Sequence, residues 1–464
     1  MSLSSKPNLA AGTERLAGYI HNMLNTLNMP QPAESAARIC LLDTLGAGLY
    51  GASVPEAGAV IAAARQMGGS HKACIWGTGQ RTSVDLAAFV CGAMCHVREL
   101  DDVHYTILHT GAVCVPAAVA VFQAVGGTLG DLLKATAAGT EAAVRIAKGM
   151  DFLDHRRRGW HGTATCGAFG AAAAAGVLLK LNREQMADAL GLSGSRTGGT
   201  WAFAADGSVS KRLHPGLAAR DGVLCAYLAQ QGLKGPRYVL ESDDGGFYPM
   251  TSSSWSLHGL DAPSKVWAVE EVEYKWYSSC KSVHSPLSAA QRIWSRNKDR
   301  HPEDITSVQV GVNSSALSMA GRMYDRDSVI SAQLSIPYGV ALGLSGRRGQ
   351  IRDYEPDTIK SNALYTLASK VEVSESREMS KLRHDLHKSG GVVTVTWADG
   401  YWDSETQTDP KGSQGSRLSA EDAAEKYMGL ASGALGESRA RKLMELVLRG
   451  STDTPAEELS PLLS

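Results

Sequence analysis

The sequence predicts a mostly α-helical protein that carries a smaller α+β segment. Apolar residues recur at helical spacing from residue 12 to about 260, between short glycine-rich breaks. Beyond that point β-branched residues begin to alternate with polar ones, which is typical of strands. Helical spacing returns over residues 419–449. We therefore expect a large all-helical domain of residues 1–262 and 403–464, interrupted by an α+β domain of residues 263–402.

The helices of the first domain are indicated by apolar spacing and by their ends. Residues 32–50 place Leu42, Leu45 and Leu49 on one face and begin with Pro32, a residue typical of a first helical turn. Further helices are expected over residues 82–97, 112–124, 130–149, 163–180, 183–193 and 215–232. The helices expected at 112–124 and 163–180 are apolar on all sides, yet both segments are too short to cross a bilayer and are bounded or interrupted by glycine. We expect both to be buried in the core.

Short runs of alternating residues predict the strands of the α+β domain. Val308, Val310 and Val312 fall on one face, and residues 393–397 alternate before an Asp399-Gly400 turn. Weaker strands are expected over residues 266–272 and 370–373, and a polar, glycine-rich loop over residues 402–416. The remaining helices are expected over residues 284–296, 328–343, 355–368, 419–433 and 437–449.

Composition excludes several classes of protein. The 464 residues carry a net charge of −1, so no global positive charge favours nucleic acid or an anionic membrane as a partner. No apolar run reaches the roughly 18–20 residues of a membrane helix, and the N-terminus lacks a hydrophobic signal core. We expect a cytoplasmic protein. The eight cysteines predict no disulfide framework, and Cys91, Cys95 and His96 lie in an apolar stretch that favours core packing over a metal site.

The first candidate segment runs from Glu99 to His109 and contains Asp101, Asp102 and His104. An aspartate beside a histidine can fix the tautomer of the imidazole and raise its basicity. The spacing fits no zinc motif, so we expect no metal here. The alternative is a polar loop whose acids cap the next helix. We favour a functional role because several titratable groups converge at one helix entrance.

The second candidate is His161, which is followed by Gly-Thr at the start of an apolar helix. The free N–H groups of a helix N-terminus attract anions, and a histidine there could give a proton to a bound carboxylate substrate. A simple capping role is the alternative.

Two further segments supply cations. Lys211 and Arg212 precede a helix and are natural partners of carboxylates, although an ordinary basic turn has the same pattern. Lys275–His284 contains two lysines and Cys280. A thiol nucleophile was weighed for Cys280, but no cysteine-protease signature is present. A carboxylate-binding loop is the better interpretation, and a buried core cysteine remains the alternative.

Five motifs occur in an order that resembles the MmgE/PrpD family, over residues 12–450. They are Glu99-Leu-Asp-Asp-x-His with His109-x-Gly-Ala-Val, His161-Gly-Thr-x-x-x-Gly-Ala-Phe-Gly, Lys211-Arg-Leu-His-Pro-Gly-x-Ala-Ala-Arg, Lys275-x-Tyr-x-Ser-Cys280-x-x-x-His284 and Ala332-Gln-x-Ser-Ile-Pro-Tyr338. Members of this family include 2-methylcitrate dehydratase, cis-aconitate decarboxylase and iminodisuccinate epimerase. The resemblance implies a large helical domain, a smaller α+β lid domain, a homodimer and no cofactor.

The resemblance also implies roles for individual residues. The aspartate, histidines and lysines of the decarboxylases correspond to Asp102, His109, His161, Lys211 and Lys275. The residues expected to bind substrate are Thr106, Arg212, Ser279, Cys280, Lys281, His284, Tyr338, Asp101 and His104. The decarboxylases have a further histidine shortly after the lysine that matches Lys275, and here Ser279 and Cys280 stand in its place.

We expect decarboxylation of aconitate to itaconate without a metal. Cations would hold the carboxylates, His161 or His109 would protonate the carbanion, and Asp102 would orient a histidine. The run from His109 to Val113 favours this reaction, because it is closer to the decarboxylase pattern than to that of the dehydratases. The alternatives are dehydration of 2-methylcitrate or a related hydroxy-tricarboxylate, epimerisation of an amino- or imino-dicarboxylate, and a non-catalytic polycarboxylate-binding protein.

Overall fold

The computed structural model describes residues 10–26, 29–206 and 208–464. The chain divides into two compact units. The first unit comprises the described residues up to Val97, then Asp101–Val272 and Ala420–Ser464. The second comprises Arg98–Leu100 and Glu273–Ser419. The mostly helical fold class with an α+β part is confirmed.

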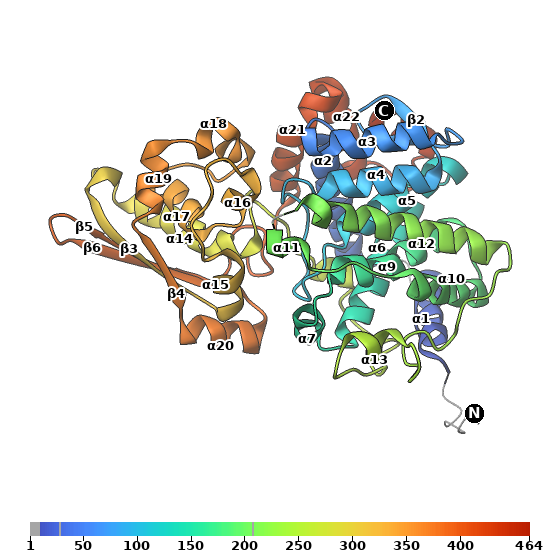
Figure 1. The fold of residues 1–464 in the computed structure, drawn as a ribbon. Helices are drawn as coiled ribbons and strands as arrows, with labels where there is room; N and C mark the ends of the chain where they lie inside the picture. The colour runs from blue at the N-terminus through green and yellow to red at the C-terminus, as the bar shows by residue number, and fades with distance from the viewer. Residues whose placement is uncertain (1–9, 27–28, 207) are drawn as a thin grey trace. The chain divides into compact units, whose positions relative to one another are not determined.

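The first unit is built from helices (Figure 1). They are α1 (Gly12–Thr26), α2 (Gln31–Gly51), α3 (Pro55–Met67), α4 (Val84–His96), α5 (Gly111–Val125), α6 (Leu129–Lys148), α7 (Phe152–Arg157), α8 (Gly162–Thr165), α9 (Gly167–Leu178), α10 (Arg183–Arg196), α11 (Phe203–Asp206), η1 (Val209–Leu213), α12 (His214–Gln230), α13 (Phe247–Thr251), η2 (Ala268–Glu271), α21 (Ala420–Leu435), α22 (Glu437–Arg449), α23 (Ala456–Leu459) and η5 (Ser460–Leu463). One small antiparallel hairpin, β1 (Ala73–Ile75) and β2 (Gln80–Thr82), departs from the expected all-helical composition.

Small residues let the central helices of this unit approach closely. Helix α9 is buried along almost its whole length and packs against α6 and α12. A Cβ atom on Gly170 of α9 would lie 2.8 Å from the carbonyl oxygen of Gly139 on α6, so only glycine fits at this crossing. None of the helices in the described part of the chain has the length and apolar character needed to cross a membrane.

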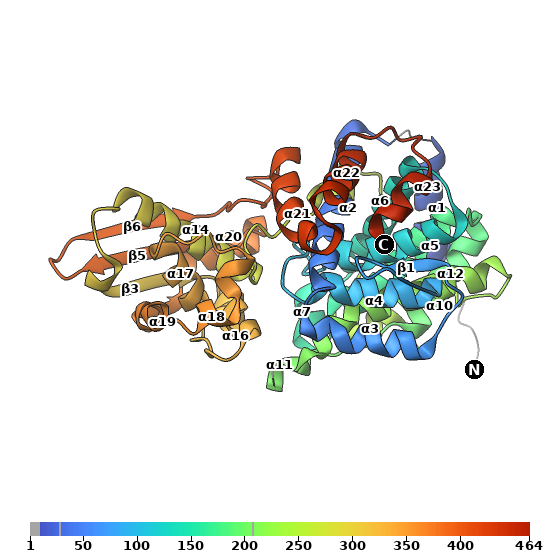
Figure 2. The ribbon, with the colours of Figure 1, turned by 90° about the horizontal axis from the view of Figure 1, so that it is seen from above.

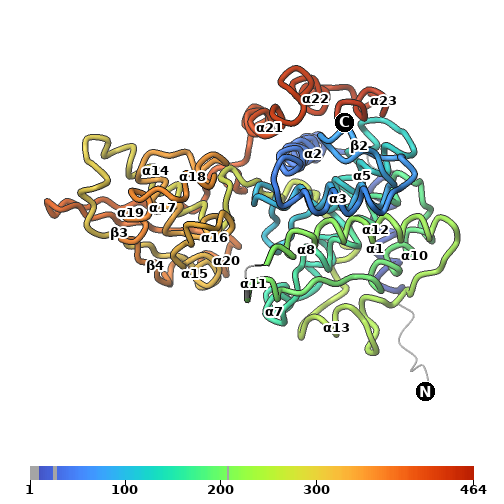
Figure 3. The backbone as a smooth tube through the Cα atoms, turned by 45° about the horizontal axis from the view of Figure 1, so that its top comes forward, coloured from blue at the N-terminus to red at the C-terminus, as the bar shows by residue number. Residues whose placement is uncertain are grey.

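The C-terminal helices α21 and α22 pack beside α2 of the same unit (Figure 3). The Lys426 ammonium on α21 lies 2.6 Å from the Asp43 carboxylate on α2, and both side chains are buried. The last residues of the chain also contact the hairpin, where the N–H of Gly77 donates to the carbonyl of Leu463. These contacts attach residues 420–464 to the first unit.

The second unit contains a four-stranded sheet of order β4-β3-β5-β6, in which β3, β5 and β6 can be followed in Figure 2. The strands are β3 (Ile305–Val312), β4 (Val371–Glu375), β5 (Gly391–Trp397) and β6 (Trp402–Gln407), and only the β3–β4 pair is parallel. Its helices are α14 (Lys281–Arg296), η3 (Pro302–Asp304), α15 (Ser314–Ala320), α16 (Val329–Gln333), α17 (Ile336–Leu344), η4 (Ile351–Tyr354), α18 (Pro356–Ile359), α19 (Asn362–Ala368) and α20 (Arg377–Leu386). Alternate valines of β3 and β5 form a core with α14 and α17.

Several expected elements differ from the structure, and three of them show the physical reason clearly. Residues 266–272 form no strand, because Ala268–Glu271 is a short 3-10 helix closed by a capping contact from Glu270. Residues 402–407 are a strand rather than part of a loop, since β6 pairs with β5 across the turn at Gly400. The predicted helix over residues 328–343 is divided, because the Ser335 side chain accepts the N–H of Tyr338 and starts a new helix there.

The unit boundaries also lie later in the chain than the expected ones. The first unit continues to Val272 because the short helix at Ala268–Glu271 packs on α2 and α6. The second unit continues to Ser419, since β6 completes its sheet and the N–H of Tyr274 donates to Gly412.

Candidate functional site

Four histidines from separate segments of the first unit lie together. We call His96, His109, His161 and His214 the histidine cluster. The ring centroids of His96 and His109 are 4.8 Å apart, those of His96 and His161 are 6.1 Å apart, and those of His161 and His214 are 5.1 Å apart. His96, His109 and His161 are buried, and His214 is partly exposed.

The loop between α4 and α5 brings the first two histidines together. His96 is the last residue of α4, and His109 lies just before the start of α5. The loop turns back on itself through a hydrogen bond of 2.7 Å between the N–H of His104 and the carbonyl of Leu108. Ile107 has a φ of 64°, a left-handed conformation that a β-branched residue rarely adopts. Strained backbone of this kind is common at functional sites.

The Asp101 carboxylate contacts both histidines at this loop. Its Oδ2 atom lies 2.6 Å from Nδ1 of His96 and 3.2 Å from Nδ1 of His109. The Nδ1 atom of His109 also lies 2.6 Å from the carbonyl oxygen of Asp102. Because every partner of that Nδ1 is an acceptor, the ring proton belongs on Nδ1. Nε2 of neutral His109 is then an unprotonated base.

The role predicted for the Asp102 carboxylate requires a correction. Its oxygens accept the N–H of Gly111 at 2.9 and 3.0 Å and the hydroxyl of Thr110 at 2.9 Å, so the carboxylate caps the start of α5. Asp102 contacts the His109 ring through its main-chain carbonyl, and the carboxylate that lies against Nδ1 of both histidines is that of Asp101. Burial and the neighbouring Asp101 charge raise the pKa of Asp102 to about 6.

The second pair of the cluster is formed by His161 and His214, whose Nδ1 atoms are 2.9 Å apart. His161 precedes α8, and the edges of its ring pack against Trp201 and Phe203. Burial, assisted by the nearby cluster histidines and Lys211, holds the pKa of His161 well below its ordinary value. Burial likewise lowers the pKa of His96 to about 3 and shifts the pKa of His214 downward. These three imidazoles are therefore neutral near pH 7.

The two predicted cations of this unit differ in their surroundings. Lys211 is partly exposed, and its charge contributes to the lowered pKa of His96, His161 and His214. Arg212 is buried, and its Nη1 donates to the carbonyl oxygen of His96 at 2.8 Å. Arg212 thus holds the C-terminal end of α4, a contact that stabilises the position of His96.

His104 and Thr106 form a separate network behind the loop. The N–H of Thr106 donates to Nδ1 of His104 at 3.3 Å, and Nε2 of His104 lies 3.4 Å from Glu271. Although burial opposes ionisation, the contacts with His104 and Lys148 lower the pKa of Glu271 to about 2. Both ring nitrogens of His104 have internal partners, so this side chain positions Thr106.

In the second unit, Lys275 forms a buried ion pair with Glu99. The Lys275 Nζ atom lies 2.7 Å from Oε2 of Glu99, and both residues are at most 2% exposed. Glu99 has a φ of 52° and belongs to the short segment Arg98–Leu100. Gln333 fixes this segment, because its Nε2 donates to the carbonyl oxygens of Arg98 and Ser278.

The other predicted residues of the second unit are held by local contacts. Cys280 is the N-cap of α14, and its N–H donates to the carbonyl of Gln333. Lys281 lies 3.2 Å from Glu273, and burial lowers the pKa of Lys281. His284 Nε2 lies 3.3 Å from the carbonyl oxygen of Ser279, and both residues are buried.

Tyr338 belongs to the aromatic core of the second unit. It is fully buried, packs against Tyr324 and Tyr354, and donates its hydroxyl to the carbonyl of Asp353 at 2.6 Å. The substrate-binding role expected for Tyr338 stays a prediction.

A metal ion was considered for the buried donors of His96, Asp101 and His109, which lie within 4.8 Å of one another. The 2.6 Å separation between His96 Nδ1 and Asp101 is that of a charge-assisted hydrogen bond. A metal on both Nδ1 atoms would move the His96 proton to Nε2, which is buried without a hydrogen-bond partner. Hydrogen bonding therefore explains the arrangement, and the absence of a metal stays a prediction.

Sequence reasoning missed three residues. The apolar stretch before His96 favours a core position, although His96 lies only five residues before Asp101. His214 lies in a motif that gives it no role. Glu99 begins a motif, and no local pattern relates it to Lys275. The density of acids and histidines over residues 96–109 was the available signal.

Comparisons with known proteins identify relatives along nearly the whole chain. The model of the MmgE/PrpD N-terminal domain matches residues 14–259, and that of the C-terminal domain matches residues 277–450. A cis-aconitate decarboxylase of Aspergillus terreus is 28% identical and covers 99% of this chain and 97% of its own. The cis-aconitate decarboxylase of Homo sapiens is 27% identical over 61% of this chain and 59% of its own. A mitochondrial 2-methylcitrate dehydratase of Yarrowia lipolytica is 22% identical over 86% and 79%.

Proposed function

Because this chain belongs to the MmgE/PrpD family, we propose that it is a lyase that decarboxylates aconitate to itaconate. The observation that carries the proposal is the histidine cluster, which brings two hydrogen-bonded histidines and an orienting carboxylate together in one unit. The decarboxylase names of the Aspergillus terreus and human relatives support this reaction.

The reaction needs one proton and neither an oxidant nor a reductant. The bond between the methylene carbon of aconitate and its carboxylate breaks, and CO₂ leaves. The released electron pair forms a new double bond at that methylene carbon. The electrons of the original double bond move to the adjacent CH carbon, beside the other terminal carboxylate. Protonation there gives itaconate, so the trianion and one proton become a dianion and CO₂.

His161 is the proposed proton donor. If His214 donates its Nδ1 proton to Nδ1 of His161, the remaining proton of neutral His161 is on Nε2. A carbanion is basic enough to take the Nε2 proton of His161. As that proton leaves, the Nδ1 proton of His214 moves onto Nδ1 of His161. His214 is partly exposed, so it can regain a proton from solvent. His109 has the opposite tautomer and is poorly suited to donate from Nε2.

The carboxylates of the substrate need cations, because the reacting species is a trianion. Lys211 is the proposed ligand beside the cluster, where its charge already affects three histidines. We keep Lys275 as a second proposed ligand on the strength of the family resemblance. Its Nζ atom lies 2.7 Å from Glu99 in a buried ion pair.

A substrate panel tests the proposed function. The pure protein is incubated separately with cis-aconitate, trans-aconitate and 2-methylcitrate, and CO₂ and organic products are measured. We expect itaconate and CO₂ in equal amounts from one aconitate isomer. The H161Q variant should lose this activity, and H258Q, which changes an exposed histidine, should retain it. Failure of the wild type to form itaconate from either isomer would overturn the proposal.

Dehydration is a second candidate, favoured by the relative from Yarrowia lipolytica. A histidine would then remove a carbon-bound proton while a hydroxyl group leaves as water. The same panel distinguishes it, because 2-methylcitrate would give an alkene without CO₂. In D₂O, uptake of deuterium into an amino- or imino-dicarboxylate without release of CO₂ would indicate an epimerase. Binding without turnover of any acid would indicate a binding protein.

We also propose a homodimer that works without a metal or cofactor, as the family resemblance implies, and we keep the expected cytoplasmic location as part of the proposal. Light scattering should give twice the mass of one chain. Activity should survive prolonged dialysis against chelators, and its loss and recovery with added metal would contradict this part of the proposal.

A further inference from the structure

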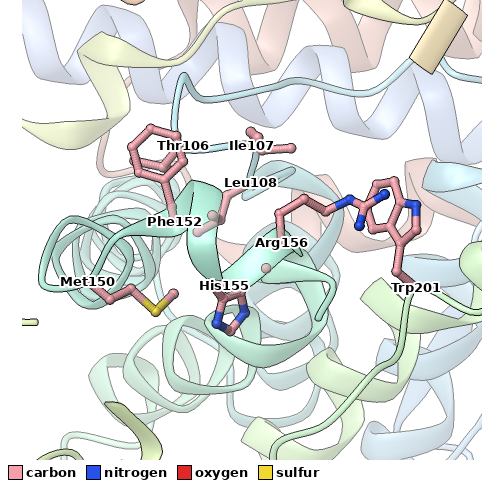
Figure 4. A pocket seen from close by; sticks show the side chains of 9 residues that line it. Thr106, Ile107, Leu108, Met150, Phe152, His155, Arg156 and Trp201 are labelled. Carbon is pink, nitrogen blue, oxygen red and sulfur yellow. The ribbon is translucent and has the colours of Figure 1, made fainter. Parts of the chain in front are cut away.

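A small cavity in the first unit borders the histidine cluster. Its volume is about 10 Å³, and Thr106, Leu108, His155, Arg156, Gly162 and Trp201 contribute to its lining (Figure 4). Gly162 directly follows His161, and Leu108 directly precedes His109. The Trp201 ring that lines the cavity also packs edge-on against His161, with 5.3 Å between centroids.

Arg156 extends across this cavity toward Trp201 (Figure 4). Its guanidinium carbon lies 3.5 Å from the centroid of the Trp201 ring. Such stacking covers one face of the guanidinium and leaves its in-plane N–H groups available. The side chain is partly buried, and desolvation lowers the pKa of Arg156 to about 10.

Arg156 lacks the acidic partner that its neighbours have. Arg158 lies 2.9 Å from Asp154, and Arg157 lies 3.7 Å from the same carboxylate. That carboxylate also accepts the N–H and hydroxyl of Ser253. Among the described residues, none places a carboxylate within 4.0 Å of Arg156 or accepts a hydrogen bond from its guanidinium.

Other buried arginines of this unit are fully engaged. Arg145 lies 2.6 Å from Glu141 and donates to three main-chain carbonyls. Arg38 lies 2.8 Å from Glu34 and donates to the carbonyls of Val447 and Gly450. A partly desolvated guanidinium without such partners costs stability, and an external anion would remove that cost.

We infer that Arg156, supported by Trp201, binds one carboxylate of the substrate. The planar N–H groups suit bidentate contact with a carboxylate, and the indole face fixes the plane in which they lie. The cavity has room for about one oxygen atom, so one oxygen of the carboxylate enters it, while the second oxygen and the rest of the ligand lie outside it toward the histidine cluster. The identity of the anion as a substrate carboxylate rests on the proposed function.

The test measures binding of propane-1,2,3-tricarboxylate, an analogue with neither a double bond nor a hydroxyl group. Titration calorimetry compares the wild type with R156Q and with the matched control R157Q, which removes an adjacent exposed arginine. We expect R157Q to bind like the wild type and R156Q to bind at least about tenfold more weakly, as for loss of a charged hydrogen-bonding partner. R156K should lie between them, because lysine keeps the charge but loses the bidentate geometry.

Equal affinity of R156Q and R157Q would overturn the inference. If R156Q does not fold, R156K takes its place, and wild-type affinity for R156K would count against bidentate binding. The proposed function fails separately. Wild type that binds the analogue and never decarboxylates aconitate would remove the reaction but keep Arg156 as an anion ligand. Normal turnover with an unchanged KM in R156Q would keep the reaction and remove Arg156 as a ligand of the substrate.

Discussion

At the scale of single residues, Asp101 is the carboxylate that contacts two members of the histidine cluster. One carboxylate oxygen faces Nδ1 of both His96 and His109. An amide at this position removes the negative charge and can present N–H groups to protonated Nδ1 atoms. At metal sites, removal of a partner that orients a histidine usually lowers activity by about 10–100-fold, and we take the same range here.

We therefore expect D101N to lower kcat by about 10–100-fold with a smaller effect on KM. Steady-state kinetics with the preferred aconitate isomer would measure both constants. The D299N variant, which changes an exposed acid of the second unit, is the control. An unchanged kcat, or a loss confined to KM, would contradict an orienting role for Asp101.

The lowered pKa of His96 makes the stability of the fold depend on pH. Burial lowers its pKa from an ordinary value of about 6.5 to about 3 in the folded protein. Below about pH 6.5 the unfolded chain gains a proton at His96 that the folded chain does not, so this residue makes the free energy of unfolding fall as the pH falls. Between pH 7 and pH 5 this amounts to about 2 kcal/mol.

The H96Q variant isolates this contribution. We expect denaturant unfolding to show that the wild type loses about 2 kcal/mol more than H96Q between pH 7 and pH 5. Identical pH slopes in the two proteins would mean that His96 is not held neutral.

The sequence identifies most of the residues of the candidate site, but it does not show which side chains contact one another. The sequence places Asp101 and Asp102 side by side, and only the loop conformation decides which carboxylate faces the histidines and which caps α5. His96 and His214 are more than one hundred residues apart in the chain, so no local pattern relates them. Arg156 is one of three consecutive arginines, and only the structure distinguishes it from its paired neighbours.

At the scale of elements, the closeness of α6 and α9 depends on glycine. We expect G170A to lower the free energy of unfolding by about 1–3 kcal/mol, because its methyl group would lie 2.8 Å from a main-chain oxygen that cannot move alone. Urea unfolding followed by circular dichroism would measure the change.

The control is G429A in helix α21, where an added Cβ meets no atom within 4 Å. Alanine there should be neutral or stabilise by up to about 1 kcal/mol, because it restricts the unfolded chain. Equal effects of the two substitutions would contradict the close crossing of α6 and α9.

Helices whose apolar residues recur at regular spacing could be predicted from the sequence. Strands made mostly of polar residues could not. The helices expected at 112–124 and 130–149 correspond to α5 and α6 within a few residues. Strand β6 has few buried side chains and uses Asp403 and Glu405 in ion pairs with Arg296, so its composition resembles that of a loop. Its pairing with β5 is a tertiary contact that local propensity does not contain.

At the scale of the whole molecule, the fold class and the family could be predicted because five motifs occur in order along the chain. The unit boundaries could not be predicted from the sequence, because they depend on which helices and strands the connecting segments contact. The short helix at Ala268–Glu271 packs on helices of the first unit, and the segment Arg98–Leu100 is held by residues of the second.

The central claim is that His161 supplies the proton that completes decarboxylation of aconitate. The most direct test is the reaction of the intact protein with aconitate in D₂O, followed by NMR of the product and by CO₂ release. We predict itaconate with one deuterium on the methylene carbon beside its carboxylate, and a large loss of rate in H161Q but not in H258Q. Itaconate formed by H161Q at the wild-type rate, or no itaconate from the wild type, would contradict the account.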